Sequence, residues 1–235
     1  MNIVNATPAA DGAEPIQPVE PGFSSLLGNR FGKTRFHELQ QSLRAAAGAT
    51  HGTLASGHEA LDAVLPGGGW PLGAITELCP VAPGIGELTL LMPALASLGR
   101  SGKQLVWIAP PHLPYPPALA SHGLPLAQLL QVHVREAREV AWAAEQALRC
   151  PAVGAVLAWP GLLDDRAVRR LQLAAETGGG CGVLYRAPTV LAQPSPAALR
   201  VHLSPDGEGL RLELRKVRGG NPHVVVVRPA AAAGP

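Results

Sequence analysis

The clearest chemical pattern in the chain is a glycine-containing segment, residues 80–89 (PVAPGIGELT). A loop that binds nucleotide phosphates uses glycines for close backbone approach, a Lys for the β- and γ-phosphates and a Ser or Thr for Mg²⁺. The corresponding positions here are Gly84, Gly86, Glu87, Leu88 and Thr89. Glu87 stands where the Lys belongs and Leu88 where the hydroxyl belongs, while Thr89 comes one residue late. Because a carboxylate repels a triphosphate, the segment predicts a degenerate nucleotide site.

The residues that lead into this loop resemble the entrance to a RecA-family ATPase core. Residues 54–62 (LASGHEALD) and 65–78 (LPGGGWPLGAITEL) contain Ser-Gly, Leu-Asp, Gly-Gly and Pro-x-Gly features in the family's order. The resemblance implies a RecA-like P-loop NTPase core, with the first strand just before the loop.

Two further positions of a RecA-like core have also lost their chemistry. The family places a water-activating Glu just beyond the second strand and a magnesium-holding Asp at the end of a later one. Pro111 stands at the first position, within residues 107–112 (WIAPPH), and Trp159 at the second, after residues 153–158 (VGAVLA). An indole cannot hold a metal, although it can fill an empty pocket or anchor a partner. With Lys, hydroxyl, Glu and Asp all replaced, we expect a non-enzyme without a cofactor.

Alternating apolar runs and helical patterns must position these residues. The expected strands are 75–79, 105–109, 130–134, 153–159 and 181–186, and the expected helices are 87–98, 117–122, 137–149 and 164–177. This alternation predicts an α/β fold with a mainly parallel sheet flanked by helices, whose strands end at one common edge. Asp164 and Asp165 fit the start of the last helix as capping residues. Pro93 should kink the first helix, because proline removes a backbone donor.

After residue 186 the pattern changes to strands alone, expected at 199–203, 210–217 and 223–228 as a C-terminal antiparallel extension. Four basic residues gather there: Arg211, Arg215, Lys216 and Arg218. Alternation with leucines puts Arg211 and Arg215 on the solvated face. Two interpretations stay open: a solubilising face, or a contact surface for DNA phosphates or an acidic partner.

Composition limits the class of protein. The 235 residues are 47% hydrophobic and 15% charged, which predicts a folded chain. A net charge of +2 gives no general attraction for nucleic acid. Three separated cysteines and scattered histidines show no disulfide or metal-site spacing, which is typical of the reducing cytoplasm. We expect no signal peptide and no membrane span.

The chain divides into four expected regions. Residues 1–34 should be a flexible segment, 35–50 a helix, 51–228 the RecA-like domain and 229–235 a frayed tail.

Residues 50–228 as a whole resemble the ImuA family, RecA-related accessory proteins of bacterial translesion DNA synthesis. Beyond the entrance, the resemblance is carried by residues 73–78 (GAITEL), 84–91 (GIGELTLL) with Pro93, 108–112 (IAPPH) and 210–220. It implies an SOS-induced protein without activity of its own. It also implies an ImuB-like relative of the Y-family polymerases and an error-prone DnaE-type polymerase as partners, with DNA as a weaker candidate.

The alternative is a SulA-type inhibitor that binds FtsZ. That family is similar over residues 87–93 (ELTLLMP), 108–111 (IAPP) and the helix after Trp159. SulA-type chains lack the Ser-Gly…Leu-Asp entrance and the basic C-terminal strands, and both features are present here, so the ImuA interpretation is preferred. A divergent ATPase is the third hypothesis.

Overall fold

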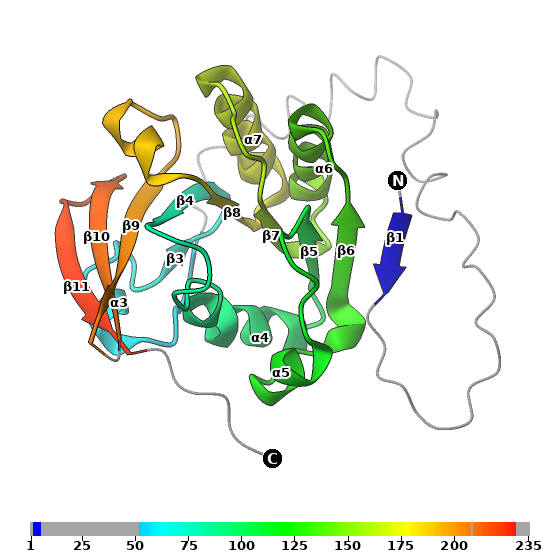
Figure 1. Ribbon diagram of the computed structural model, residues 1–235, viewed down its shortest axis with the longest axis horizontal. Helices are drawn as coiled ribbons and strands as arrows, with labels where there is room; N and C mark the ends of the chain where they lie inside the picture. Colours follow the sequence, from blue (N-terminus) through cyan, green and yellow to red (C-terminus); the bar gives the residue numbers. More distant parts are fainter. Residues whose placement is uncertain (1, 6–51, 208, 229–235) are drawn as a thin grey trace. The chain divides into compact units, whose positions relative to one another are not determined.

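One nine-stranded sheet organises the chain in the computed structural model, which describes residues 2–5, 52–207 and 209–228 (Figure 1). The strands lie in the order β1-β6-β5-β7-β8-β4-β9-β10-β11. Their bounds are β1 Asn2–Asn5, β4 Ala74–Pro80, β5 Gln104–Ile108, β6 Leu129–His133, β7 Val153–Ala158, β8 Cys181–Tyr185, β9 Leu199–Asp206, β10 Gly209–Val217 and β11 His223–Val227. A separate pair joins β2 (Thr53–Leu54) to β3 (Trp70–Pro71).

The central part of the sheet is parallel. Strands β6, β5, β7, β8, β4 and β9 all run in one direction, while β10, β11 and β1 pair antiparallel with their neighbours. Parallel strands are buried on both faces and therefore need continuous apolar runs. Strand β7 (VGAVLA) is such a run, and all six of its residues are buried. The predicted mainly parallel sheet with a C-terminal antiparallel extension is confirmed.

Helices cover both faces of the parallel part (Figure 1). Helices α6 (Ala137–Arg149) and α7 (Asp165–Gly178) lie side by side on one face, and α4 (Met92–Arg100) and α5 (Pro116–Ser121) lie on the other. The sheet accordingly separates two hydrophobic cores. Asp164 caps α7 as expected, since its carboxylate accepts a hydrogen bond from the backbone N–H of Ala167 at 2.7 Å.

The helix that follows the glycine-containing loop begins later than predicted. Residues Thr89–Leu91 form a short 3-10 helix, η1, and α4 starts only at Met92. Pro93 therefore lies in the first turn of α4, where a missing N–H removes no helical hydrogen bond. The expected kink at Pro93 is wrong for this reason.

The Ser-Gly…Leu-Asp entrance packs against this same region. The backbone N–H of Ser56 donates to the Asp62 carboxylate at 2.9 Å, which fixes the short helix α3 (Glu59–Asp62). A Cβ atom added to Gly57 would lie 2.4 Å from the Cβ of Pro93, so only glycine fits there. The motif is thus explained by close packing of the entrance against the start of α4.

Two short 3-10 helices, η2 (Leu126–Gln128) and η3 (Pro188–Ala192), complete the described elements. The helix predicted at 35–50, the tail at 229–235 and most of the segment at 1–34 lie outside the described residues. Within that first segment, Asn2–Asn5 forms β1, a strand that the sequence pattern does not predict. Among the described residues, no helix is long and apolar enough to cross a membrane.

Candidate functional site

The segment predicted to be a degenerate phosphate loop lies at the C-terminal end of β4. Residues 81–88 connect β4 to η1 and α4, the strand–loop–helix order of a phosphate-binding loop. Gly84 and Gly86 have φ values of 82° and 104°, which glycine reaches without strain. Glu87 turns back into this loop, and its Oε1 accepts a hydrogen bond from the backbone N–H of Gly84 at 2.9 Å. The carboxylate thus holds a backbone donor of the kind that such loops present to phosphate.

The remaining loop positions differ from those of a phosphate-binding loop. The side chain of Leu88 packs against the hydrophobic core on the α4 side of the sheet. Thr89, one residue later, is the first residue of η1. The second Glu87 oxygen, Oε2, is buried and has no hydrogen-bond partner among the residues that the structure describes. A further anion placed beside it would be repelled by this carboxylate.

Trp159, at the position of the expected magnesium-binding Asp, belongs to an aromatic cluster. Its indole stacks on the Tyr185 ring, with centroids 4.5 Å apart and planes 4° apart, and meets Trp107 edge-on at 6.3 Å. The Tyr185 hydroxyl donates to the Glu87 carbonyl oxygen at 3.4 Å, so this cluster also contacts the phosphate-like loop. Burial raises the pKa of Tyr185 well above 10.0, with a smaller contribution from Glu87. The phenol therefore stays neutral and serves as a hydrogen-bond donor.

Pro111 and His112, at and beside the expected catalytic Glu, are exposed in the loop after β5. The loop begins at Ala109, whose φ of 52° is a left-handed value rarely adopted by residues with a Cβ atom. Pro83 is exposed as well. Trp159, whose indole we expected to be able to fill an empty pocket, packs against Tyr185 and Trp107, while Pro111 faces solvent.

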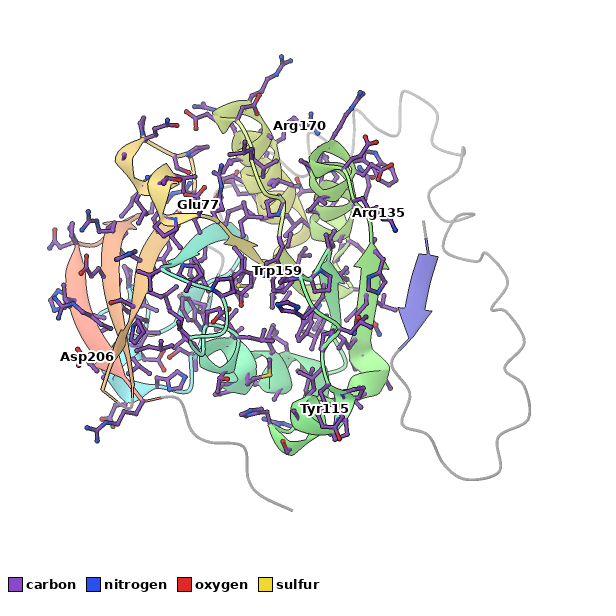
Figure 2. All side chains as sticks on the ribbon, in the orientation of Figure 1. Glu77, Tyr115, Arg135, Trp159, Arg170 and Asp206 are labelled. Carbon is purple, nitrogen blue, oxygen red and sulfur yellow. The ribbon has the colours of Figure 1, made fainter. Side chains whose placement is uncertain are left out.

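A buried ion-pair cluster next to this site was not predicted. Glu77, in the middle of β4, is fully buried, and its two carboxylate oxygens accept from Arg186 at 2.7 Å and from Arg200 at 2.6 Å. Arg186 also donates to the Leu163 carbonyl oxygen in the loop after β7. In Figure 2 Glu77 lies in the interior, at β4. A lone Glu inside an apolar strand was the signal in the sequence, because such a charge needs buried partners.

Arg200 extends the cluster to the segment that carries η3. Its guanidinium donates to the carbonyl oxygens of Val190 and Gln193 at 2.7 and 2.6 Å. The cluster thus fixes two loops at the C-terminal edge of the sheet, one after β7 and one after β8.

The four basic residues of β10 and its C-terminal flank divide into two pairs. Arg211 and Arg215 lie on the solvated face as predicted, on either side of Glu213, which contacts both at 3.4 and 2.9 Å. The Glu213 contacts are solvent-exposed ion pairs of low energetic value.

Lys216 and Arg218, in contrast, contact the segment after η3. The Lys216 ammonium donates to the Ser195 carbonyl oxygen at 2.6 Å, and burial lowers its pKa, as do Arg218 and Arg200. Arg218 lies 3.5 Å from the Pro196 carbonyl oxygen and 3.6 Å from Glu176. The four basic residues therefore have two different sets of contacts.

Other chemistry is limited in the described part of the chain. No group of three or more His, Cys, Asp or Glu residues is arranged to hold a metal there. Burial raises the pKa of both Cys79 and Cys181 to about 12, so these thiols are not nucleophiles at neutral pH.

Comparison with known proteins gives two related groups. The family model for the cell division inhibitor SulA matches residues 73–182. Protein ImuA of Caulobacter vibrioides is 34% identical over 197 residues, which cover 72% of this chain and 80% of the relative. The cell division inhibitor SulA of Yersinia enterocolitica is 30% identical over 134 residues, covering 56% of this chain and 80% of the relative. SulA of Edwardsiella piscicida is 36% identical over 97 residues, covering 41% and 58%.

Proposed function

Because the chain belongs to the family that contains ImuA and SulA, we propose that it is a non-catalytic, ImuA-type accessory protein of SOS-associated mutagenesis. In this proposal it works in the cytoplasm by binding other proteins. The ImuA-type role is supported by the length of the sequence alignment, since 197 residues align with ImuA and 134 with the SulA relative from Yersinia enterocolitica. The proposed fold is a RecA-like core whose nucleotide site has lost its function.

One observation carries the non-catalytic part of the proposal, namely the contact between Glu87 and Gly84. A loop N–H that would cradle a phosphate is already bound to a carboxylate of the same loop, at 2.9 Å. Binding a nucleotide would require breaking this hydrogen bond and placing a triphosphate against an anion, which costs several kcal/mol in a partly dehydrated site. The absence of a Lys and of a metal-binding hydroxyl leaves nothing to offset that cost.

The proposed partners are an ImuB-like relative of the Y-family polymerases and an error-prone DnaE-type polymerase. Direct contact with DNA is a weaker part of the proposal. The exposed pair Arg211 and Arg215 supports it, but Glu213 between them halves the local positive charge.

A second candidate is a SulA-type role as a ligand of FtsZ. The match of the SulA model to residues 73–182 supports it, because this range runs from β4 to the start of β8 and includes Glu87, Leu88, Pro111 and Trp159. The two roles differ in the partner and are separated by a binding experiment.

The test is to immobilise the full-length chain and measure its affinity for three purified proteins: the ImuB-like protein, the DnaE-type polymerase and FtsZ from the same bacterium. We expect binding to the ImuB-like protein and not to FtsZ. Binding to FtsZ alone would replace the proposal with the SulA-type role, and binding to none of the three would contradict both.

A further inference from the structure

Strand β11 is the outermost strand at one end of the sheet (Figure 1). It pairs with β10 on one side, and among the described residues no strand lies beside it on the other, here called the free side of β11. The free side of an outer strand presents backbone N–H and C=O groups that can pair with a strand from another chain.

The sequence of β11 (HVVVV) lacks the features with which outer strands usually avoid such pairing. It contains no Lys, Arg, Asp or Glu and no Pro. Its register with β10 is continuous from Leu210↔Val227 to Leu214↔His223, so no bulge turns the strand away. Valine is also a residue that favours the extended conformation. Strand β11 is therefore regular, uncharged and able to accept a further strand.

The two faces of β11 differ in their surroundings. On one face, Val227 is buried and Val225 packs against the same hydrophobic core, which also contains Leu61 of α3. On the other face, Val224 and Val226 are 48% and 43% exposed. These two valines are neighbours, because residues two apart in a strand share one face. An exposed apolar pair thus lies directly at the free side of β11.

The charges around β11 do not select a charged partner. Residues 206–228 contain five cationic and three anionic residues, and α3, which packs against β11, adds two more carboxylates. They are Arg211, Arg215, Lys216, Arg218 and Arg228 against Asp206, Glu208, Glu213, Glu59 and Asp62. Because the two signs are equal in number and interspersed, neither nucleic acid nor a strongly acidic or basic protein is favoured.

A second copy of the chain fits the free side of β11. In an antiparallel pair around a twofold axis at Val225, Val224 of each copy lies opposite Val226 of the other. Such valine pairs stabilise a sheet, and no charged residue of one β11 lies opposite one of the other. The two copies also close each other's free side, whereas a single strand from another protein would leave a new one exposed.

We propose that two copies of the chain associate through β11, so that one continuous sheet runs across both. The contact consists of one short strand from each copy, so we expect a dissociation constant on the order of 10 μM. Strand β11 lies outside residues 73–182, the range matched by the SulA family model. The dimer therefore uses a part of the chain that this match does not include.

The first experiment is sedimentation velocity of the full-length chain between about 1 and 100 μM, where we expect a monomer to become a dimer. The double variant Val224→Lys/Val226→Lys places lysines of the two copies opposite each other and should weaken association at least about tenfold. The matched control Leu162→Lys/Leu173→Lys adds the same charge at leucines that are 86% and 54% exposed elsewhere, and should associate within about twofold of wild type. Circular dichroism should show unchanged folds, because all four positions are exposed.

The second experiment needs no variant and locates the contact. Hydrogen exchange of the wild type should slow in residues 223–227 when the concentration rises from about 1 to 100 μM. Exchange in β6, near the opposite end of the sheet, should not change. Added salt should not weaken association, because no pair of opposite charges is formed at the contact.

Several results would overturn the proposal. A wild type that stays monomeric, or a lysine variant that associates as well as wild type, would do so. Concentration-dependent protection in β6 instead of β11 would place the contact at the other end of the sheet. Protection of β11 that is independent of concentration and lost on deletion of residues 229–235 would assign the free side to this chain's own C-terminal residues. Protection that needs the ImuB-like protein or an oligonucleotide would assign it to that partner.

The proposed function is tested separately. Both experiments use the chain alone, whereas the proposed function is measured as binding to the ImuB-like protein. A monomeric wild type would therefore overturn the dimer and leave the proposed function unaffected.

Discussion

The indole of Trp159 lies face to face with the ring of Tyr185, at a centroid distance of 4.5 Å and an interplanar angle of 4°. This stack stands at the end of β7, where a RecA-like ATPase would need a magnesium-holding carboxylate. The stack also connects the loop after β7 to Glu87 through the Tyr185 hydroxyl. A position expected to carry metal chemistry has thus become part of the packing between loops.

Trp159→Asp should therefore destabilise the protein without creating a metal site. Losing the stack and placing a carboxylate among aromatic rings should lower the free energy of unfolding by about 3 kcal/mol. The measurement is urea unfolding, with Trp142→Ala as control. Trp142 is exposed on α6, so its removal should change stability by less than about 0.5 kcal/mol. A Trp159→Asp variant as stable as wild type would show that the stack contributes no stability.

Glu77→Gln should be among the most destabilising single changes at this edge. It leaves Arg186 and Arg200 facing each other in the interior, and breaking a buried ion pair costs about 3–5 kcal/mol. Hydrogen exchange should rise in residues 187–197, because Arg200 positions their carbonyl oxygens through this cluster. The control is Glu213→Gln, which breaks exposed ion pairs and should lower the free energy of unfolding by less than about 1 kcal/mol. Equal effects of the two changes would contradict the structural role given to Glu77.

The architecture was predictable because its signals are local. Strands such as β7 are continuous apolar runs, and α7 begins at an Asp164 cap that the sequence shows directly. The start of α4 was misplaced because Glu87 and Leu88 fit a helical pattern. In the structure the Gly84–Glu87 hydrogen bond holds them in the loop instead.

The candidate site was predictable only in part, because its contacts join distant residues. The positions Glu87, Leu88, Pro111 and Trp159 are predicted as replaced positions by comparison with a known motif. The partners of Trp159 and Glu77 could not be predicted, since Tyr185 and Arg200 come from other strands. The basic residues after position 210 formed one cluster in sequence, yet Arg211 and Arg215 contact Glu213, while Lys216 and Arg218 contact the segment after η3.

The two basic pairs should respond differently to charge reversal. Arg211→Glu/Arg215→Glu changes exposed side chains and should fold with stability within about 1 kcal/mol of wild type. Lys216→Glu/Arg218→Glu removes the ammonium group that donates to the Ser195 carbonyl oxygen and places a second carboxylate beside Glu176. This double change should lower the free energy of unfolding by about 2 kcal/mol or more. Thermal unfolding separates the two cases. If Arg211 and Arg215 contact DNA phosphates, the variant Arg211→Glu/Arg215→Glu should also lose salt-sensitive DNA binding. Unchanged DNA binding by this variant would identify the two arginines as part of a solubilising face.

Stability should fall at alkaline pH because two thiols are buried in the neutral form. Burial raises the pKa of Cys79 and of Cys181 from 9.0 to about 12, with Glu77 adding to the effect at Cys79. The unfolded thiols ionise first, so the stabilisation is complete below pH 9.0 and is lost as pH rises towards about 12. Urea unfolding across this pH range should show that the free energy of unfolding declines, and that it declines less steeply in Cys181→Ala than in the wild type. A stability that does not change between these limits would contradict the burial of both thiols.

The central claim is that the chain's own side chains have replaced the chemistry of a nucleotide site. Calorimetric titration of the full-length protein with Mg·ATP tests it most directly, with Glu87→Lys as the companion variant. We predict no binding with a dissociation constant in the sub-millimolar range, and no turnover by Glu87→Lys, because Leu88, Pro111 and Trp159 remain. A sub-millimolar dissociation constant for wild type, or ATP hydrolysis by the variant, would contradict the account.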